Sequence, residues 1–112
     1  MLAPPGSAVV QITWTASPFR GDKFAAIWGP MAEAALDYGA TSYAFLRSSD
    51  DRLLFNQFAA FESTLDFERY WLSEQLSEAR AQATGMFSLP VVPVWHTVTG
   101  AGSRLLEQAH RG

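Results

Sequence analysis

Cysteine is absent from this sequence, and its absence excludes disulfide bonds and thiolate metal sites. Positive charge is scarce as well: 8 Lys and Arg residues against 11 Asp and Glu residues give a net charge of −3, with no basic cluster of the kind that binds nucleic acid or acidic membranes. The sequence also lacks a secretory segment and any apolar run long enough to span a membrane. We therefore expect a cytoplasmic protein that contacts small molecules or other protein surfaces, and neither nucleic acid nor membrane.

Signatures of the common enzyme classes are missing too. The 8 glycines are scattered rather than gathered into a phosphate-binding loop, there is no nucleophile elbow, and no His, Asp and Glu residues have metal-ligand spacing. These absences argue against nucleotide binding, hydrolysis by an activated serine, and metal catalysis. We expect no metal site and no bound cofactor.

What the sequence does contain is apolar and aromatic material for a core. Of its 112 residues, 48% are apolar and 13% aromatic, which suits a single compact domain and leaves no room for a second. The prolines and the glycine of residues 1–7 predict a loose leader, and the polar residues 100–112 predict a tail that forms a short helix or frays. The core of the domain is expected over 8–99.

Hydrophobic periodicity predicts six secondary-structure elements. In chain order they are a strand over 8–16, a helix over 24–38, strands over 41–48 and 52–62, a helix over 65–84 and a strand over 89–98. Gly29-Pro30 either kinks the first helix or divides it into two short ones, because proline removes a backbone donor. Ser63 or Thr64 is expected to cap the second helix, and Gly85 follows its end.

This order, β-α-β-β-α-β, predicts an α+β protein with the ferredoxin-like arrangement, a four-stranded antiparallel sheet with two helices on one face. Right-handed crossovers give the strand order 4-1-3-2, which places the strand 89–98 at an edge of the sheet. Pro90 and Pro93 favour the same position, since proline would break the hydrogen-bond ladder of a central strand.

The face of the sheet away from the helices is predicted to be covered by a second copy of the chain. Two helices bury only one face, yet three of the four predicted strands carry apolar residues on both faces. A large exposed apolar patch is rarely tolerated on a monomer. We therefore expect an obligate homodimer in which two sheets pack face to face into an α+β barrel.

Asn56 and Gln57 stand side by side in the middle of the predicted strand 52–62, so their side chains must point to opposite faces. The residues that alternate with Asn56 leave more space than those that alternate with Gln57. We therefore predict that Asn56 faces a pocket between the helices and the sheet, held by Gln11, Tyr70 or His96, and that Gln57 faces the dimer side. Either amide could instead pair with an amide of the second copy.

Three stretches, GATSYAFLRSSDD, FAAFESTLDFERYWLSEQLSEARA and PVVPVWHTV, resemble the dimeric α+β barrel superfamily and, within it, the antibiotic-biosynthesis monooxygenase-like group. The resemblance covers residues 8–99. The residues that match the group's pattern at the end of the third strand and the start of the second helix are Phe61, Ser63, Phe67, Tyr70 and Ser73. The resemblance implies the dimeric barrel fold. Some members of the group oxidise aromatic polyketides with dioxygen and no cofactor, and several have no demonstrated reaction.

Other members of the group cleave haem, and they carry a Trp where this sequence has Tyr70 and an iron-ligating His where it has Arg80. A guanidinium group stays protonated and cannot serve as that ligand. The resemblance, with Arg80 at the ligand position, therefore disfavours haem cleavage as the activity of this protein.

Polar side chains dispersed among aromatic ones are the remaining candidates for a site. We predict Asn56 and His96 as catalytic residues, with His96 as the side chain that exchanges protons near neutral pH. Trp14, Tyr70 and Arg80 are predicted to bind substrate. Each of the five has a structural alternative: an amide contact between subunits, a partly exposed structural histidine, aromatic packing, or a helix ion pair for the arginine.

Two functions remain open at this point. In the first, a phenolic substrate lies between aromatic residues, Asn56 or His96 assists its deprotonation, and the resulting carbanion reduces dioxygen directly. In the second, the same pocket holds an apolar metabolite or is filled by side chains, and the dimer acts as a binding or structural module. Gln11 and Thr13, the polar residues of the strand 8–16, are further candidates to line the pocket.

Overall fold

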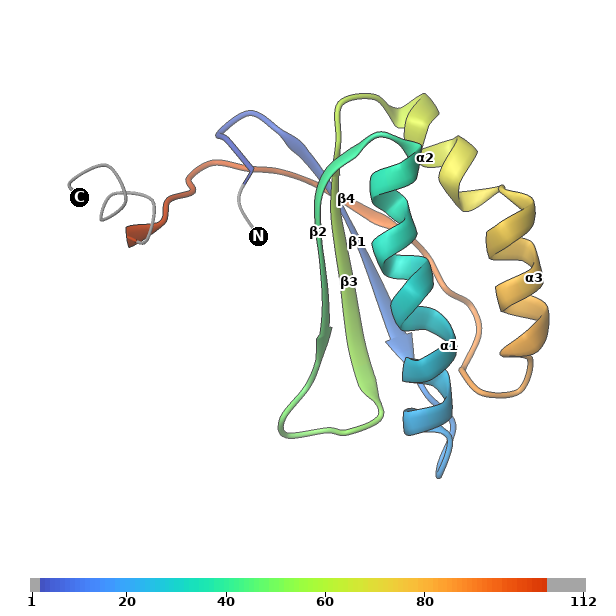
Figure 1. The fold of residues 1–112 in the computed structure, drawn as a ribbon. Helices are drawn as coiled ribbons and strands as arrows, with labels where there is room; N and C mark the ends of the chain where they lie inside the picture. Colours follow the sequence, from blue (N-terminus) through green and yellow to red (C-terminus); the bar gives the residue numbers. More distant parts are fainter. Residues whose placement is uncertain (1–2, 105–112) are drawn as a thin grey trace.

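The computed structural model describes residues 3–104, in which helices cover one face of a sheet (Figure 1). The elements are β1 (Ala8–Thr15), α1 (Gly21–Glu33), the 3-10 helix η1 (Ala34–Tyr38), β2 (Ala40–Arg47), β3 (Leu54–Phe61), α2 (Thr64–Trp71), α3 (Glu74–Gln82) and β4 (Val94–Thr97). The strands have the order β2-β3-β1-β4, and every neighbouring pair is antiparallel. The predicted α+β class, the ferredoxin-like topology and the edge position of the last strand are confirmed.

The side chains of each strand alternate between the face covered by helices and an open face. On β1, Ile12 and Trp14 point to the helices and are fully buried, as the alternation of the sequence predicts. Ile12 pairs with Gln57 of β3, and Thr13 pairs with Asn56. Gln57 therefore belongs to the helix face and Asn56 to the open face, so the predicted orientation of the two amides is wrong.

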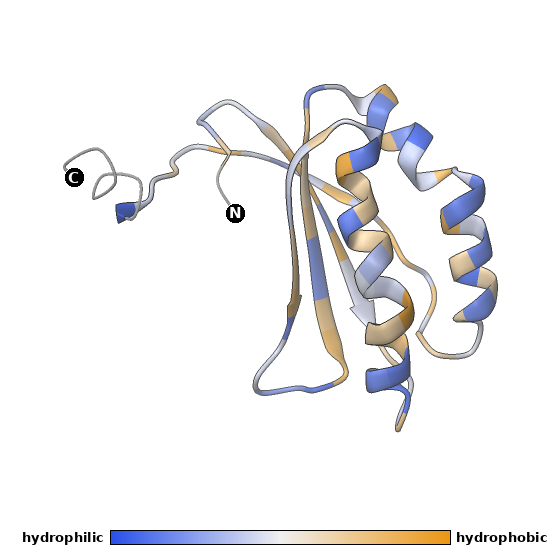
Figure 2. Cartoon of the chain, in the orientation of Figure 1, coloured by the Kyte–Doolittle hydropathy of each residue, from blue (hydrophilic) through white to orange (hydrophobic). Residues whose placement is uncertain are grey.

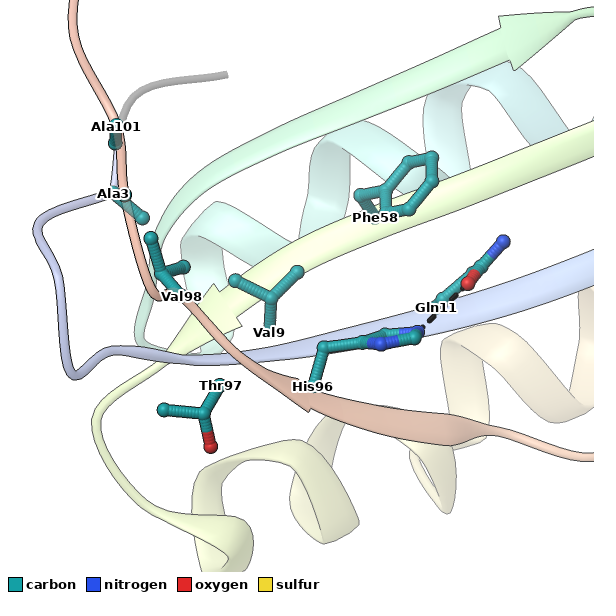
Figure 3. A pocket seen from close by; sticks show the side chains of 9 residues that line it. Ala3, Val9, Gln11, Phe58, His96, Thr97, Val98 and Ala101 are labelled. Atoms are coloured by element: carbon teal, nitrogen blue, oxygen red, sulfur yellow. Dashed lines mark hydrogen bonds between the residues drawn. The ribbon is translucent and has the colours of Figure 1, made fainter.

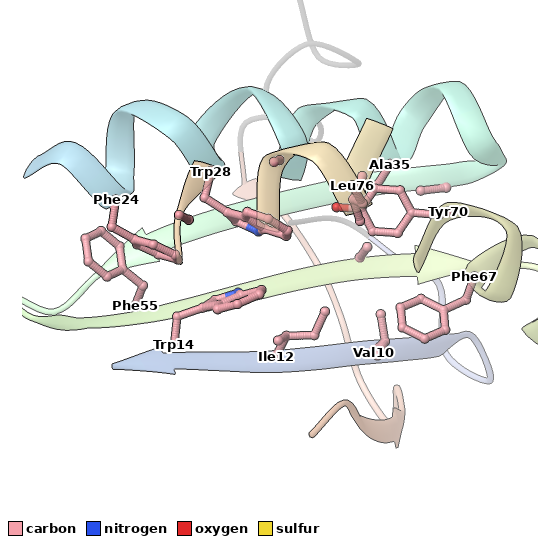
Figure 4. Close-up of a cluster of buried hydrophobic side chains, with 14 of the residues drawn as sticks. Val10, Ile12, Trp14, Phe24, Trp28, Ala35, Phe55, Phe67, Tyr70 and Leu76 are labelled. Carbon is pink, nitrogen blue, oxygen red and sulfur yellow. The ribbon is translucent and has the colours of Figure 1, made fainter. Parts of the chain in front are cut away.

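An aromatic cluster fills the space between the sheet and the helices (Figure 4). The ring centroid of Trp14 lies 4.5 Å from that of Trp28 on α1 and 5.0 Å from that of Phe87. Phe67 and Tyr70 of α2 extend the cluster, with their centroids 6.3 Å apart. Because each Å² of apolar surface removed from water contributes about 25 cal/mol, these large rings are a main source of stability for the fold.

Helix α1 runs through Pro30 to Glu33, so the alternative of two short helices divided at Gly29-Pro30 is wrong. Although Pro30 cannot donate a hydrogen bond, its carbonyl still accepts one from the N–H of Ala34. The chain then tightens into η1, which ends at Gly39 with a φ of 102°. A positive φ is the conformation that glycine adopts most readily at a helix end.

The predicted helix 65–84 is in fact two helices. The backbone is extended at Ser73, whose hydroxyl accepts a hydrogen bond from the N–H of Leu76 and so caps α3. Ser63 caps α2 in the same way, through the N–H of Asp66, which confirms one of the two predicted caps. A single continuous helix would place Leu65, Leu72 and Leu76 on one stripe, but Leu65 is 53% exposed and Leu72 73% exposed, whereas Leu76 of α3 is fully buried.

The last strand is shorter than predicted, Val94–Thr97 instead of 89–98. Pro90 and Pro93 lie in the connection that leads to it. They lack the N–H groups with which a strand residue joins its neighbour, so pairing with β1 begins only after the second proline.

Residues 3–7 are not the loose leader that the sequence predicted. The N–H of Gly6 donates to the Val98 carbonyl, the N–H of Val98 donates to the Ser7 carbonyl, and Ala3 is 6% exposed. Residues 1–2 of the predicted leader and 105–112 of the predicted tail lie outside the described residues. Within residues 3–104, no helix combines the length and the hydrophobicity needed to cross a membrane.

Candidate functional site

The predicted site residues lie on opposite sides of the sheet. Trp14 and Tyr70 are fully buried on the helix side, whereas Asn56 and His96 project from the open face. Arg80 lies on α3, on the helix side. The structure therefore does not gather the five side chains in one pocket. On the open face Gln11 links Asn56 with His96. On the helix side Gln57 links Trp14 with Tyr70.

Gln57 is the centre of the hydrogen bonds on the buried side. Its Oε1 atom accepts the indole N–H of Trp28 at 2.8 Å and that of Trp14 at 3.2 Å. Its Nε2 group donates to the Tyr70 hydroxyl at 2.8 Å, and this hydroxyl donates to the Met31 carbonyl at 2.7 Å. Figure 2 shows the hydrophilic stretch in the middle of β3 that contains this amide. One glutamine thus supplies hydrogen-bond partners to the polar groups of three buried aromatic side chains, and buried polar groups need such partners.

The side chains that surround Gln57 are buried and fill the core. Gln57 is 1% exposed, and Trp14, Trp28 and Tyr70 are completely buried. Burial raises the pKa of the Tyr70 hydroxyl well above its ordinary value of 10.0, so the group stays protonated at neutral pH. The space where the sequence predicted a pocket is filled by indole and phenol rings.

Arg80 lies along the ring of Trp71. Its Nη2 group donates to the Trp71 carbonyl at 2.9 Å, and its guanidinium carbon is 5.0 Å from the centroid of that ring. Burial lowers the pKa of Arg80, and Tyr70 opposes this shift. The Nη1 atom is buried without a hydrogen-bond partner in the described part of the chain. The arginine thus makes a cation–π contact, in place of the helix ion pair that was its structural alternative.

On the open face, four polar side chains form a line across β4, β1 and β3. The Nε2 atom of His96 lies 2.8 Å from Gln11 Oε1 (Figure 3). Gln11 Nε2 donates to Asn56 Oδ1 at 3.2 Å, and the Thr13 hydroxyl donates to the same oxygen at 2.8 Å. Because both bonds use the amide oxygen of Asn56, its Nδ2 donors stay available to another molecule.

A hollow of about 330 Å³ lies beside this polar line. Val9, Phe58 and Val98 contribute apolar surface to it, and Gln11 and His96 contribute the polar groups (Figure 3). The segment that follows β4 forms one wall. A mostly apolar hollow with a few oriented polar groups is the usual form of a small-molecule site.

No protein-family model and no curated protein matches the sequence. The fold that carries the hollow is nevertheless found in solved structures. A candidate antibiotic biosynthesis monooxygenase from Nitrosomonas europaea superposes with a TM-score of 0.74 at 13% identity, over 87% of this chain and 94% of the other. Rv0793 from Mycobacterium tuberculosis superposes with a TM-score of 0.71 at 18% identity, over 87% and 99% of the two chains. For a variant of SnoaB, a cofactor-independent oxygenase from Streptomyces nogalater, the TM-score is 0.70 at 11% identity, over 86% and 97%.

The chain has the fold of the antibiotic biosynthesis monooxygenase-like proteins. At these identities the likeness concerns the fold alone, and it agrees with the fold that the resemblance implied for the single chain. Among residues 3–104, no group of three His, Asp or Glu side chains is placed to hold a metal ion.

Sequence reasoning found the polar members of the open-face line and missed its apolar wall. Gln11 does hold Asn56, as predicted, but on the face opposite to the one expected. Val9 and Phe58 were not singled out, although the alternation along their strands places them on the same face as Gln11 and Asn56. Val98 was not singled out either, although it closes the predicted strand 89–98 two residues after His96 and so shares its face in that prediction; in the structure it lies just beyond β4.

Proposed function

We propose that the protein binds a small aromatic molecule in the open-face hollow and oxidises it with dioxygen, without a bound cofactor. The hydrogen-bonded line from His96 through Gln11 to Asn56, beside an apolar wall, carries this proposal. It offers an imidazole that can take a proton and an amide that can donate to an oxyanion. SnoaB, which has the same fold, is a cofactor-independent oxygenase, and this likeness supports the reaction class.

The reaction requires a substrate with an acidic C–H bond, such as the methylene group of an anthrone-type phenol. His96 accepts the proton, and the Nδ2 group of Asn56 donates a hydrogen bond to the oxygen that receives the negative charge. The carbanion then reduces dioxygen. The methylene carbon loses two hydrogens and gains one oxygen atom as a carbonyl, and the second oxygen atom leaves as water.

The proposal includes a homodimer formed through the open faces of two sheets. No Asp, Glu, Lys or Arg side chain projects from the four strands onto this face, which sets it apart from an ordinary solvated surface. Leu46 and Val94 on it are 54% and 50% exposed. A second copy would cover this apolar surface and exclude water from the hollow, which strengthens the electrostatic contacts inside.

A binding module without catalysis is the second candidate. Two observations favour it. The space around Gln57 is filled by side chains, and His96 is connected to Asn56 only through the neutral amide of Gln11. In this case the hollow holds an apolar metabolite and no proton transfer takes place.

Oxygen uptake with anthrone as the substrate separates the two candidates. The oxygenase proposal expects uptake by the wild type and loss of at least about 100-fold in His96→Ala and in Asn56→Leu, the usual scale for removing a general base or an oxyanion donor. His110→Ala, which removes the other histidine of the sequence, is the matched control and should keep full activity. Binding of anthrone without oxygen uptake would favour the binding module. Uptake that survives in both site variants would overturn the assignment of the site.

A further inference from the structure

Gln11 is held in one orientation by its neighbours on the open face. Its Nε2 group donates to Asn56 Oδ1 at 3.2 Å, and that oxygen also accepts the Thr13 hydroxyl at 2.8 Å. An amide that donates on one side presents its oxygen on the other, so Gln11 Oε1 is the atom that faces His96 at 2.8 Å.

The orientation of Gln11 determines which nitrogen of His96 carries the proton. An amide oxygen only accepts hydrogen bonds, so Nε2 of His96 must be the donor. A neutral imidazole has a single N–H group, and Nδ1 is then left with its lone pair. No hydrogen bond of the described residues uses this Nδ1 atom.

We infer that Gln11 is a positioning residue that fixes the Nε2–H form of His96, and that Nδ1 thereby accepts a hydrogen bond from a weakly acidic hydroxyl group of the ligand. The role of Gln11 stands without any reaction, whereas the ligand class rests on the proposed function of the hollow. A chain of oriented hydrogen bonds behind a histidine is the usual means by which a protein selects one tautomer.

The lining of the hollow favours a neutral phenol or enol over other ligands. Val9, Phe58 and Val98 suit a flat apolar body, and among residues 3–104 no Lys or Arg side chain lines the hollow to hold a ligand that is already an anion. A volume of about 330 Å³ fits a small molecule. The hydroxyl of such a ligand donates to Nδ1, which is also the direction in which a proton would pass to a base.

The tautomer is measured by two-bond 1H–15N correlation NMR of ¹⁵N-histidine-labelled protein, at a pH where His96 is neutral. The His110→Gln background leaves His96 as the sole histidine, and the same protein unfolded in urea supplies the reference ratio of the two tautomers. We expect folded protein to hold His96 in the Nε2–H form in excess over this reference. A folded protein with the proton on Nδ1, or with the unfolded ratio, would overturn the inference without the need for any variant.

Variants of Gln11 test whether this residue is the cause. In Gln11→Leu the ratio of the two tautomers should fall by about fivefold, the factor that corresponds to one hydrogen bond of about 1 kcal/mol. Gln11→Glu keeps an accepting oxygen, and it should preserve the Nε2–H form while losing the bond to Asn56. An unchanged ratio in Gln11→Leu, or the same loss in both variants, would show that Gln11 does not set the tautomer.

The ligand class is tested with 2-naphthol and 2-methoxynaphthalene, which differ in the hydroxyl that can donate. We expect 2-naphthol to shift the Nδ1 resonance of His96 and to bind at least about fivefold more tightly than its methyl ether, the factor for one hydrogen bond. Equal binding of the two, a shift at Nε2 alone, or no binding of either would overturn the ligand class. Absence of oxygen uptake, in contrast, would overturn only the proposed reaction.

Discussion

Trp28 donates its indole N–H to Gln57 Oε1 across 2.8 Å, and both side chains are buried in the space between sheet and helices. This contact joins α1 to the middle of β3. Because strand side chains alternate, it also sends the neighbouring Asn56 to the open face, where it meets Gln11. The contact of Gln57 with the helices and the place of Asn56 in the open-face site are therefore two consequences of one orientation of β3.

Replacing Gln57 with Leu should destabilise the fold strongly. Leucine fills a similar volume but leaves the indole N–H groups of Trp14 and Trp28 without an acceptor, and each unsatisfied buried group costs about 1–3 kcal/mol. We expect the free energy of unfolding to fall by about 3 kcal/mol, measured by urea denaturation.

Asn56→Leu is the matched control, since it makes the same change at the next position of β3. Asn56 is only partly buried within its own chain, and its two donors, on Gln11 and Thr13, are less deeply buried than the indoles that donate to Gln57, so the loss should be smaller than in Gln57→Leu. Equal losses in the two variants would contradict the central role of Gln57.

The two amides also show where sequence reasoning succeeds and where it fails. The alternation of β1 was predicted correctly because apolar and polar residues alternate there without exception from Val10 to Thr15. On β3 both alternating sets are apolar, so periodicity could not orient the strand. We oriented this strand by the space that the residues alternating with each amide leave, and this criterion was wrong. What favours the observed orientation is the pair of partners on the helices: the indole N–H of Trp28 donates to Gln57, and the hydroxyl of Tyr70 accepts from it.

The division of α2 from α3 was also missed, although its signal stands in the sequence. Ser73 is followed by Glu74, a good N-cap with an acidic residue in the first turn, in the middle of a segment of strong helix formers. High helix propensity on both sides made one long helix the simpler prediction. The hollow on the open face was beyond the reach of periodicity, because it depends on how the segment after β4 lies against residues 3–7.

Tyr70→Phe should change how stability depends on alkaline pH. Burial raises the pKa of Tyr70 above 10.0, so the folded state keeps a proton that the unfolded state releases. This contribution is complete below pH 10 and is lost as the pH rises above it. We expect the wild type to lose stability from about pH 10 upward and the variant to lose less over the same range, in urea titrations.

At neutral pH the variant should already be about 1–3 kcal/mol less stable, since Gln57 and Met31 lose their bonds to the hydroxyl. The same alkaline slope in both proteins would contradict this account.

Asp22→Asn tests the ion pair that ties α1 to β2. The Nη1 group of Arg47 lies 2.7 Å from Asp22 Oδ1, and this hydrogen bond and charge hold the pKa of the carboxyl below 3.8. A lowered pKa contributes stability above the ordinary value, and the contribution is lost as the pH falls through the lower one. The difference in unfolding free energy between wild type and variant should therefore be constant near neutrality and shrink below about pH 4. Asp50→Asn, at a carboxylate for which no ion pair is found within residues 3–104, should show no such change. A difference that does not vary with pH would contradict the pairing.

Gly39→Ala should destabilise the end of η1. The φ of 102° at this position is strained for alanine, and a Cβ atom would lie 2.9 Å from Asp66 Oδ2. Gly6→Ala is the control, because Gly6 also has a positive φ, 91°, but has no atom within 4 Å of the added Cβ. We expect a loss of about 1–3 kcal/mol in unfolding free energy at Gly39, larger than the loss at Gly6. Equal losses would mean that the contact with Asp66 relaxes without cost.

Leu46→Glu and Leu72→Glu together test the proposed homodimer, because they place the same charge on two exposed leucines on opposite sides of the sheet. Leu46, on the open face, is 54% exposed, and Leu72, at the junction of α2 and α3, is 73% exposed. On a monomer both substitutions would be nearly neutral, within about 0.5 kcal/mol in unfolding free energy. In a dimer formed through the open faces, each copy of Leu46→Glu would bury a glutamate without a partner, at a cost of several kcal/mol.

We therefore expect sedimentation analysis to find a wild-type dimer at micromolar concentration. The dissociation constant of this dimer should rise at least about 100-fold in Leu46→Glu and stay unchanged in Leu72→Glu. A folded wild-type monomer, or equal behaviour of the two variants, would contradict the sheet-to-sheet dimer and with it the exclusion of water from the hollow beside His96.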